Sequence, residues 1–165
     1  MSETGQGAAA RGNRSGHRGY IASRAVRGQD WPQHVQNLVV RDYAQRQGLH
    51  YLLSATEYAM DGCYMNLESV LGELERIEGV ILFSVFMLPQ RRERRLELYE
   101  RVFAAGADLH GALESMPVRT PEDAARLEDI LAVERCLGGE KGSGPFSQLG
   151  KRDLTPFSGA PEMLL

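Results

Sequence analysis

The chain has 165 residues, of which 42% are hydrophobic and 25% are charged, and its formal net charge at pH 7 is −3. These values are typical of one soluble domain with a single hydrophobic core. The sequence lacks the roughly 18 to 20 consecutive apolar residues of a membrane helix, and its first residues have no apolar run that could form a signal peptide. We therefore expect a cytoplasmic protein that makes no contact with membranes.

Charge and cysteine content argue against two further classes of protein, nucleic-acid-binding domains and domains held by disulfides or zinc. The acidic balance disfavours a nucleic-acid partner, because such domains carry a basic surface that replaces counterions on phosphates. Cys63 and Cys136 have no Cys or His at ligand spacing, so both are expected to remain reduced thiols. One dense basic cluster is interleaved with glutamates and is interpreted as the solvated start of a helix. It consists of Arg91, Arg92, Arg94 and Arg95.

Both ends of the chain lack a hydrophobic period. Residues 1–17 and 139–165 are rich in small and polar side chains, which favours flexible tails. Between them, short apolar runs alternate with longer segments of helical period. Residues 18–138 are therefore expected to form one α/β domain.

The first predicted strand runs from Arg18 to Ser23. A polar loop follows, and Pro32 opens the next helix because a proline in the first helical turn loses no hydrogen bond there. This helix is expected to extend to about Gln47 and to stop at Gly48. Four apolar positions would face the sheet: Val35, Leu38, Val39 and Ala44.

The second predicted strand runs from Leu49 to Ser54, and residues 55–65 form a long loop. The helix after this loop has the cleanest amphipathic pattern of the sequence, and Gly79 ends it. Its apolar positions are Leu67, Val70, Leu71, Leu74 and Ile77. Val80 to Val85 is apolar nearly throughout, as expected of a central parallel strand that is covered on both faces.

A third helix follows Pro89 and stops at Gly106, and the fourth predicted strand runs from Asp108 to Leu113. Thr120 and Pro121 then provide the N-cap and first turn of a last helix. The third helix would bury Leu96, Tyr99, Val102 and Phe103, and the last would bury Leu127, Ile130 and Leu131.

This order of elements predicts a single-domain three-layer α/β sandwich of the flavodoxin or resolvase type, with a mostly parallel sheet of roughly four strands. Right-handed crossovers place the carboxyl ends of parallel strands along one edge, where open sheets bind their ligands. The predicted loops at this edge are rich in polar residues and tyrosine. Functional side chains should therefore be sought there.

His34, Asn37 and Arg41 recur at i, i+3 and i+7 and line one stripe of the first helix. His34 lies nearest the helix N-terminus, where an anion is favoured. Arg41 would hold a phosphate or carboxylate group, and Asn37 would bind hydroxyl groups. The alternative is that His34 and Asn37 only cap and solvate the helix.

We expect Ser54 and Glu57 to converge with this stripe in one polar pocket. Ser54 would bind hydroxyl groups, whereas Glu57 and His34 would form the catalytic pair that moves a proton near neutral pH. Arg24 and Tyr58 complete the predicted substrate-binding set. The alternative for Glu57 is that it satisfies backbone donors in a tight loop.

Other candidates carry less weight. Cys63 would be a nucleophile only if a base such as His34 approached it. His50 and His110 lie at strand starts, away from the ligand edge, and are interpreted as structural. The sequence has no glycine-rich nucleotide loop, P-loop, nucleophile elbow or paired-histidine motif, so we expect neither a nucleotide cofactor nor a metal.

One resemblance to a known family rests on the segments GYIASR, PQHVQNLVVRDY, GLHYLLSATEYAM and ILFSVFMLP. With these segments, the chain resembles the sporadic carbohydrate cluster protein family over roughly residues 18 to 137. This resemblance implies an association with gene clusters that build surface polysaccharides or unusual sugars, and it implies no particular reaction. The chain departs from the pattern at Met87, where a polar residue is expected.

A more distant resemblance rests on the segments GYIASR, LESVLGELERIEGVILFSVFML and ILAVERCL. It is a resemblance to the catalytic domain of serine recombinases. That family carries a tyrosine, arginine and serine pattern in its first strand. If Ser23 were the nucleophile, position 21 would be arginine, but it is Ile21. FMLPQR also replaces the Asp-Arg-Leu-Gly-Arg turn of the family. The resemblance therefore implies the fold without the constellation that stabilises charge at a scissile phosphate.

The function expected from these patterns is a role in carbohydrate biosynthesis, in which the protein acts on or binds a sugar or nucleotide-sugar intermediate. Two alternatives remain: a non-catalytic partner that regulates the pathway enzymes, and a degenerate domain of the serine-recombinase type. Whether the protein is an enzyme stays open, as does a homodimer.

Overall fold

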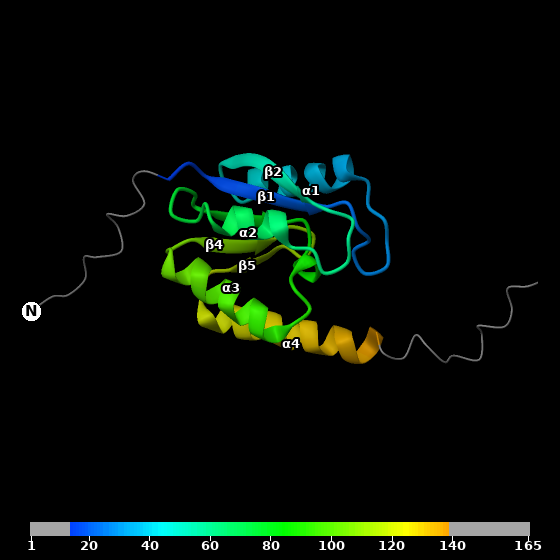
Figure 1. The fold of residues 1–165 in the computed structure, drawn as a ribbon. Helices are drawn as coiled ribbons and strands as arrows, with labels where there is room; N and C mark the ends of the chain where they lie inside the picture. Colours follow the sequence, from blue (N-terminus) through cyan, green and yellow to red (C-terminus); the bar gives the residue numbers. More distant parts are fainter. Residues whose placement is uncertain (1–13, 139–165) are drawn as a thin grey trace, which may run out of the picture. The chain divides into compact units, whose positions relative to one another are not determined.

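A five-stranded sheet organises the fold, in the order β2-β1-β3-β4-β5 (Figure 1). The first four strands are mutually parallel, and β5 runs antiparallel to β4. The predicted α/β fold with a mostly parallel sheet is therefore confirmed, with one strand more than expected. The strands are β1 (His17–Ala22), β2 (Tyr51–Glu57), β3 (Gly79–Leu82), β4 (Asp108–Gly111) and β5 (Met116–Val118).

The computed structural model describes residues 14–138. The chain divides into two compact units, residues 1–129 and 130–165. Of the second unit, the description covers residues 130–138, the last turns of one helix. Most of both predicted tails lies outside the described residues. Residues 14–17 do not: His17 begins β1, and the backbone N–H of Ser15 donates to the carbonyl of Arg76 at 3.0 Å.

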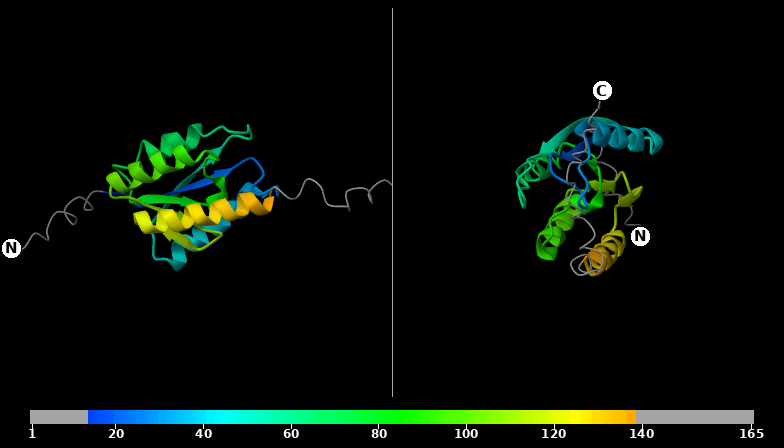
Figure 2. Two further views of the ribbon diagram at one scale, coloured as in Figure 1. Left: turned by 90° about the horizontal axis from the view of Figure 1, so that it is seen from below. Right: turned by 90° about the vertical axis from the view of Figure 1, so that its right-hand side faces the viewer.

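Helices cover both faces of the sheet. One face carries α1, and the opposite face carries α2 and α3 (Figure 2). None of the helices among the described residues combines the length and the apolar composition that crossing a membrane requires. The helices are α1 (Gln33–Arg46), α2 (Met65–Leu71), the short 3-10 helix η2 (Val85–Met87), α3 (Arg92–Ala104) and α4 (Pro121–Gly138).

The buried face of α1 differs from the predicted one. Leu38 is 68% exposed, whereas Gln36 is fully buried. The Gln36 amide group accepts from the backbone N–H of Ala22 at 3.0 Å and donates to the Ala22 carbonyl at 2.8 Å. These bonds satisfy backbone groups at the carboxyl end of β1, and they turn Leu38 away from the sheet.

The third helix buries Tyr99 and Val102 as predicted, but two neighbouring positions differ. Arg95 is buried, and Leu96, which was expected in the core, is 38% exposed. The interpretation of the basic cluster as fully solvated is therefore wrong for Arg95. Its guanidinium group forms an ion pair with Glu128 at 2.7 Å, so burial of the charge is compensated.

Three strands, β2, β3 and β4, end elsewhere than predicted. β2 continues through Glu57, so residues 55–57 belong to the sheet and not to a loop. β3 ends at Leu82, and the Ser84 hydroxyl accepts from the backbone N–H of Phe86 at 3.2 Å, which caps η2. The predicted fourth strand is divided between β4 and the tight turn at residues 112–115.

The strand that the sequence missed is β5. It has three residues and contains Pro117, which pairs with His110 in the antiparallel register. A proline is tolerated there because β5 lies at the edge of the sheet. The turn before it places Ser115 in the left-handed region, with φ at 51°. The hairpin sends the chain back to the amino edge of the sheet.

Candidate functional site

A pocket of about 540 Å³ lies between α1 and the edge strand β2. It brings together four of the five side chains that were expected to converge, and a tyrosine and two leucines complete its wall. The lining residues are His34, Asn37, Leu38, Arg41, Tyr51, Leu53 and Ser54. The predicted stripe of α1 therefore faces the second strand.

Ser54 reaches this pocket because β1 has a glycine beside it. A β-carbon at Gly19 would lie 3.0 Å from the Ser54 β-carbon and 3.1 Å from the Tyr51 ring, and would clash with the Ser54 hydroxyl. The Ser54 and Tyr51 hydroxyl groups share a hydrogen bond of 2.9 Å. The Arg41 guanidinium lies 5.9 Å from the centre of the Tyr51 ring. Tyr51 therefore contacts both Ser54 and Arg41, and the three form a polar and aromatic wall of the pocket.

Asn37 carries an unsatisfied acceptor in this pocket. Its side-chain oxygen Oδ1 is buried and has no hydrogen-bond partner in the structure. An unpaired buried oxygen costs about 1–3 kcal/mol, so a rotation of the Asn37 side chain that exposed this oxygen to a hydroxyl or amine donor of a ligand would be favourable.

Glu57 lies outside this pocket, contrary to the prediction. The pairing of β2 with β1 is irregular between Tyr51 and Ser54 and regular from Ser54 to Glu57. Because alternate residues of a regular strand point to opposite faces, Ser54 and Glu57, three positions apart, face opposite sides of the sheet. Glu57 is fully buried. Its carboxylate accepts from the Tyr20 hydroxyl at 3.0 Å and from the backbone N–H of Leu67 at 3.1 Å.

The backbone N–H groups of Tyr58 and Asn66 also donate to Glu57, each at 3.1 Å. Burial raises the pKa of Glu57, but the donors from Leu67, Tyr58, Asn66 and Tyr20 outweigh this effect and hold the pKa below its ordinary value. The N–H groups of Asn66 and Leu67 belong to the first turn of α2, so Glu57 satisfies backbone donors at the start of that helix. This agrees with the alternative interpretation, in which Glu57 serves backbone donors and not catalysis. His34 and Glu57 therefore do not line one pocket.

Arg24 and Tyr58 do not line the pocket either. Arg24 donates to the carbonyl oxygens of Cys63 at 2.7 Å and Met60 at 3.3 Å, and its guanidinium lies 4.7 Å from the centre of the Tyr64 ring. It fixes the segment between β2 and α2. Tyr58 is 54% exposed. Their predicted role in substrate binding stays a prediction.

The carboxyl ends of β1 and β3 present few free polar groups. Ile21 is buried, and the exposed Ser23 hydroxyl accepts from the Gln33 side-chain amide at 2.8 Å. After β3, Met87 is buried in the core. Ser84, which precedes it, donates from its hydroxyl to Glu114 at 2.6 Å. The hydroxyl groups of Ser23 and Ser84, which follow β1 and β3, are thus hydrogen-bonded to other side chains of the protein.

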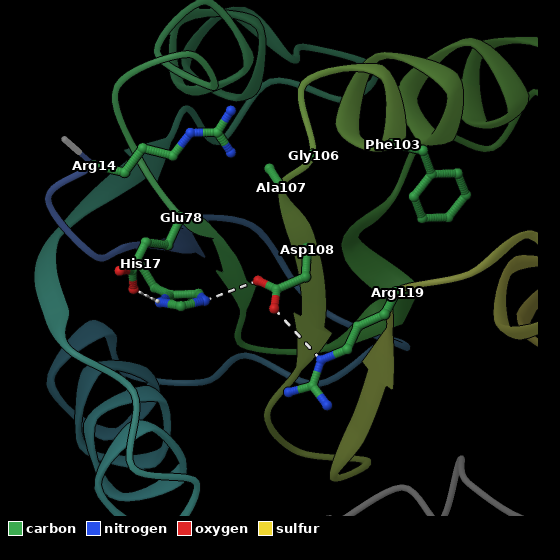
Figure 3. A pocket seen from close by; sticks show the side chains of 8 residues that line it. All are labelled: Arg14, His17, Glu78, Phe103, Gly106, Ala107, Asp108 and Arg119. Carbon is green, nitrogen blue, oxygen red and sulfur yellow. Dashed lines mark hydrogen bonds and ion pairs between the residues drawn. The ribbon is translucent and has the colours of Figure 1, made fainter. Parts of the chain in front are cut away.

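A second pocket, of about 500 Å³, lies at the opposite, amino edge of the sheet (Figure 3). His17 and Arg119 both point at Asp108 there, with His17 Nε2 at 2.8 Å and Arg119 Nε at 3.4 Å from its carboxylate oxygens. Burial raises the pKa of Asp108, but His110 and His17 outweigh it and bring the pKa well below its ordinary range. Sequence reasoning missed this cluster, because His17 fell in a predicted tail.

Comparison with solved structures finds similar folds, among them the following two. The N-terminal catalytic domain of TP901-1 integrase matches with a TM-score of 0.53 and 17% identity, over 76% of this chain and 99% of that one. The chain has a resolvase-like fold. A resolvase family site-specific recombinase from Streptococcus pneumoniae matches with a TM-score of 0.54 and 10% identity, over 74% of this chain and 90% of that one.

At these identities the likeness concerns the fold alone, and it confirms the predicted resolvase-like architecture. No family model and no curated protein matches the chain, so the resemblance to the carbohydrate cluster family gains no support from those comparisons.

Proposed function

We propose that this resolvase-like domain binds an anionic carbohydrate, such as a sugar phosphate or nucleotide sugar, in the pocket between α1 and β2, and that it does not cleave DNA. The observation that carries the proposal is the unpartnered Asn37 oxygen in a pocket shared with Arg41 and Ser54. A carbohydrate has the hydroxyl donors that this oxygen lacks.

The anionic part of the ligand is assigned to Arg41 and His34. Arg41 provides a permanent charge, and His34 lies in the first turn of α1, where the helix dipole favours an anion. That turn has no acidic residue and no side-chain cap that would compete. The exposed Leu38 and Leu53, with the Tyr51 ring, offer apolar surface against a sugar ring.

The lack of cleavage chemistry supports a binding function. Strand cleavage through Ser23 would require a positive group to stabilise the developing charge, and losing one such group commonly costs about 100-fold or more in rate. Ile21 is apolar and buried where the recombinase pattern has arginine. A degenerate recombinase-type domain that has kept the fold and changed its ligand fits this arrangement.

Calorimetric titration of the full chain with glucose 1-phosphate and with a uridine diphosphate sugar tests the proposal. Arg41→Gln should weaken the binding of either probe by about 10- to 100-fold, because a hydrogen bond to a charged group is lost. Arg46→Gln is the matched control: Arg46 lies on the same helix, pairs with Asp42 at 2.7 Å and does not line the pocket. Equal binding by the wild type and Arg41→Gln would contradict the proposal.

A second candidate function is binding of a partner protein, with another copy of this chain as the first candidate. Leu53 is 77% exposed on β2, an edge strand of the sheet, and Leu38 is 68% exposed beside it. Such apolar positions on an open edge favour association. Light scattering should then report a dimer that Leu53→Lys dissociates and Leu113→Lys, at an exposed position elsewhere, does not.

A further inference from the structure

Three side chains meet at the amino edge of the sheet although they come from non-adjacent strands. Asp108 and His110 stand two residues apart on β4 and so point to the same face. His17 lies at the start of β1, and β3 runs between these two strands. Neighbouring strands are about 4.8 Å apart, so His17 and Asp108 are separated by twice that spacing.

Gly79 bridges this separation by having no side chain. It is the residue of β3 that pairs with His17 on one side and with Asp108 on the other. A β-carbon at Gly79 would clash with the Asp108 carboxylate and would lie 2.9 Å from the His17 ring. The two side chains therefore meet in the space that this glycine leaves open.

The donor atoms converge on one point. His17 Nε2 lies 2.8 Å and His110 Nε2 lies 3.2 Å from Asp108 Oδ1, and the ligand atoms of the three residues all lie within 4.8 Å of one another. In a tetrahedral site, two atoms bound to one Zn²⁺ at about 2.0–2.1 Å each lie about 3.3–3.4 Å apart. The two nitrogen–oxygen distances are slightly shorter than this, so a small outward shift of the side chains would admit an ion.

His110 is oriented through its other ring nitrogen, because His110 Nδ1 shares a hydrogen bond of 2.9 Å with the buried Tyr43 hydroxyl. His17 Nδ1 makes no hydrogen bond within residues 14–138 and lies 3.5 Å from a Glu78 carboxylate oxygen. Metal-binding histidines are commonly held by a carboxylate or hydroxyl group on the outer nitrogen, as His110 is. The Nε2 atoms of both histidines lie beside Asp108 Oδ1.

One of these nitrogens lacks a partner. His110 is fully buried, and its Nε2, which lies 3.2 Å from Asp108 Oδ1, has no assigned hydrogen-bond partner among the described residues. A buried ring nitrogen that is aimed at a carboxylate without bonding to it is costly in a purely structural network. A cation between the two groups would satisfy both.

We propose that His17 Nε2, His110 Nε2 and Asp108 Oδ1 form a binding site for a divalent transition metal, with Zn²⁺ as the best-suited ion. Two imidazoles and one carboxylate suit zinc, and three protein ligands leave one coordination position free. His17 and Asp108 line a pocket together with Arg14 and Arg119, and these two positive charges suit an anionic group on the metal. The site lies at the amino edge of the sheet, opposite the carboxyl edge at which open parallel sheets bind their ligands. It does not depend on the proposed function.

Zinc titration of the full chain, stripped with a chelator and carrying no histidine tag, tests the site. Competition with a chromophoric chelator should show one equivalent of Zn²⁺. Affinity should fall at least about 10- to 100-fold in His17→Gln and in Asp108→Asn. With Co²⁺, the protein should show the visible bands of a tetrahedral ion without a thiolate charge-transfer band.

Matched variants separate this site from other ligands of the chain. His50→Gln, at an exposed histidine, and the double variant Cys63→Ser/Cys136→Ser should bind Zn²⁺ like the wild type. Circular dichroism without metal checks that each variant is folded. Because Gln can still donate to Asp108, His17→Gln decides the matter even if a change at buried His110 unfolds the protein. Absence of Zn²⁺ binding, or binding unchanged in His17→Gln and Asp108→Asn, would overturn the proposal.

Discussion

Arg95 and Glu128 form a buried ion pair with two parallel hydrogen bonds. Arg95 Nε donates to one carboxylate oxygen of Glu128 and Nη2 donates to the other, each at 2.7 Å. The Tyr99 hydroxyl donates to the same carboxylate at 2.9 Å, and Arg95 Nη1 donates to the carbonyls of Pro89 and Gln90. This network ties the start of α3 to α4 and to the segment that follows η2.

Arg95→Met should therefore destabilise the protein strongly. Removing one partner leaves the Glu128 carboxylate buried without its counterion, which typically costs about 3–5 kcal/mol in unfolding free energy. Arg92→Ala is the control, because Arg92 is 63% exposed and lies 3.6 Å from the same carboxylate. Its loss should cost less than about 1 kcal/mol. Urea denaturation of both variants measures the difference, and equal midpoints would contradict it.

Glu57→Gln should destabilise the protein at neutral pH by about 1–3 kcal/mol, because donors to a buried carboxylate lose their charged acceptor. The folded state lowers the pKa of Glu57, so its contribution is present above the unfolded pKa of about 4.3 and is lost as the pH falls through the folded value. The stability gap between wild type and variant should narrow in acid below about pH 4.3. A gap that is constant between pH 7 and pH 3 would argue against an ionised Glu57.

Gly79→Ala should cost about 1–3 kcal/mol, because the added β-carbon overlaps the Asp108 carboxylate and forces that strand edge apart. Gly72→Ala serves as the control. Gly72 is exposed and right-handed, with φ at −68°, and a β-carbon there would lie 3.2 Å from the Ser69 carbonyl oxygen, so alanine should cost less than at position 79. Thermal unfolding of the two variants gives the comparison. A tolerated alanine at position 79 would show that His17 and Asp108 do not need this gap.

Incubation with supercoiled plasmid should leave the DNA uncut and free of covalently bound protein. Ser23 is the exposed hydroxyl at the end of β1, but no arginine stands at position 21 to stabilise charge on a phosphate. A covalent adduct that disappears in Ser23→Ala would contradict this prediction. Gel analysis under denaturing conditions separates the two outcomes.

Hydrophobic period predicted the positions of the helices and of the parallel strands, because those signals are local, but α2 ends at Leu71 and not at the predicted Gly79. The period also failed at Gln36 and Arg95, two polar side chains that the structure buries. Their partners are the backbone of Ala22 and the carboxylate of Glu128, which lie 14 and 33 residues away. A pattern within one helix contains no information on a distant partner, so part of each buried face was predicted wrongly, although Ala44, Tyr99 and Val102 are buried as expected.

The two candidate sites also differ in how far local sequence spacing predicts them. The spacing of His34, Asn37 and Arg41 on one helix was sufficient to predict a shared stripe, and the structure brings them into one pocket with Ser54. The cluster of His17, Asp108 and His110 depends instead on strand order and on the residue between the strands. Gly79 was interpreted as a helix stop, and only the register shows the space that it leaves.

The β4–β5 hairpin links the length of a turn to the chemistry of a distant cluster. Its register pairs Leu109 with Val118, so the next residues outward, Asp108 and Arg119, come within 3.4 Å of each other. Side chains alternate along a strand, and inserting or deleting one residue in the turn at 112–115 would send Arg119 to the other face of the sheet. Natural variation in that turn would therefore change the charge beside the histidine cluster without altering any residue of the cluster itself.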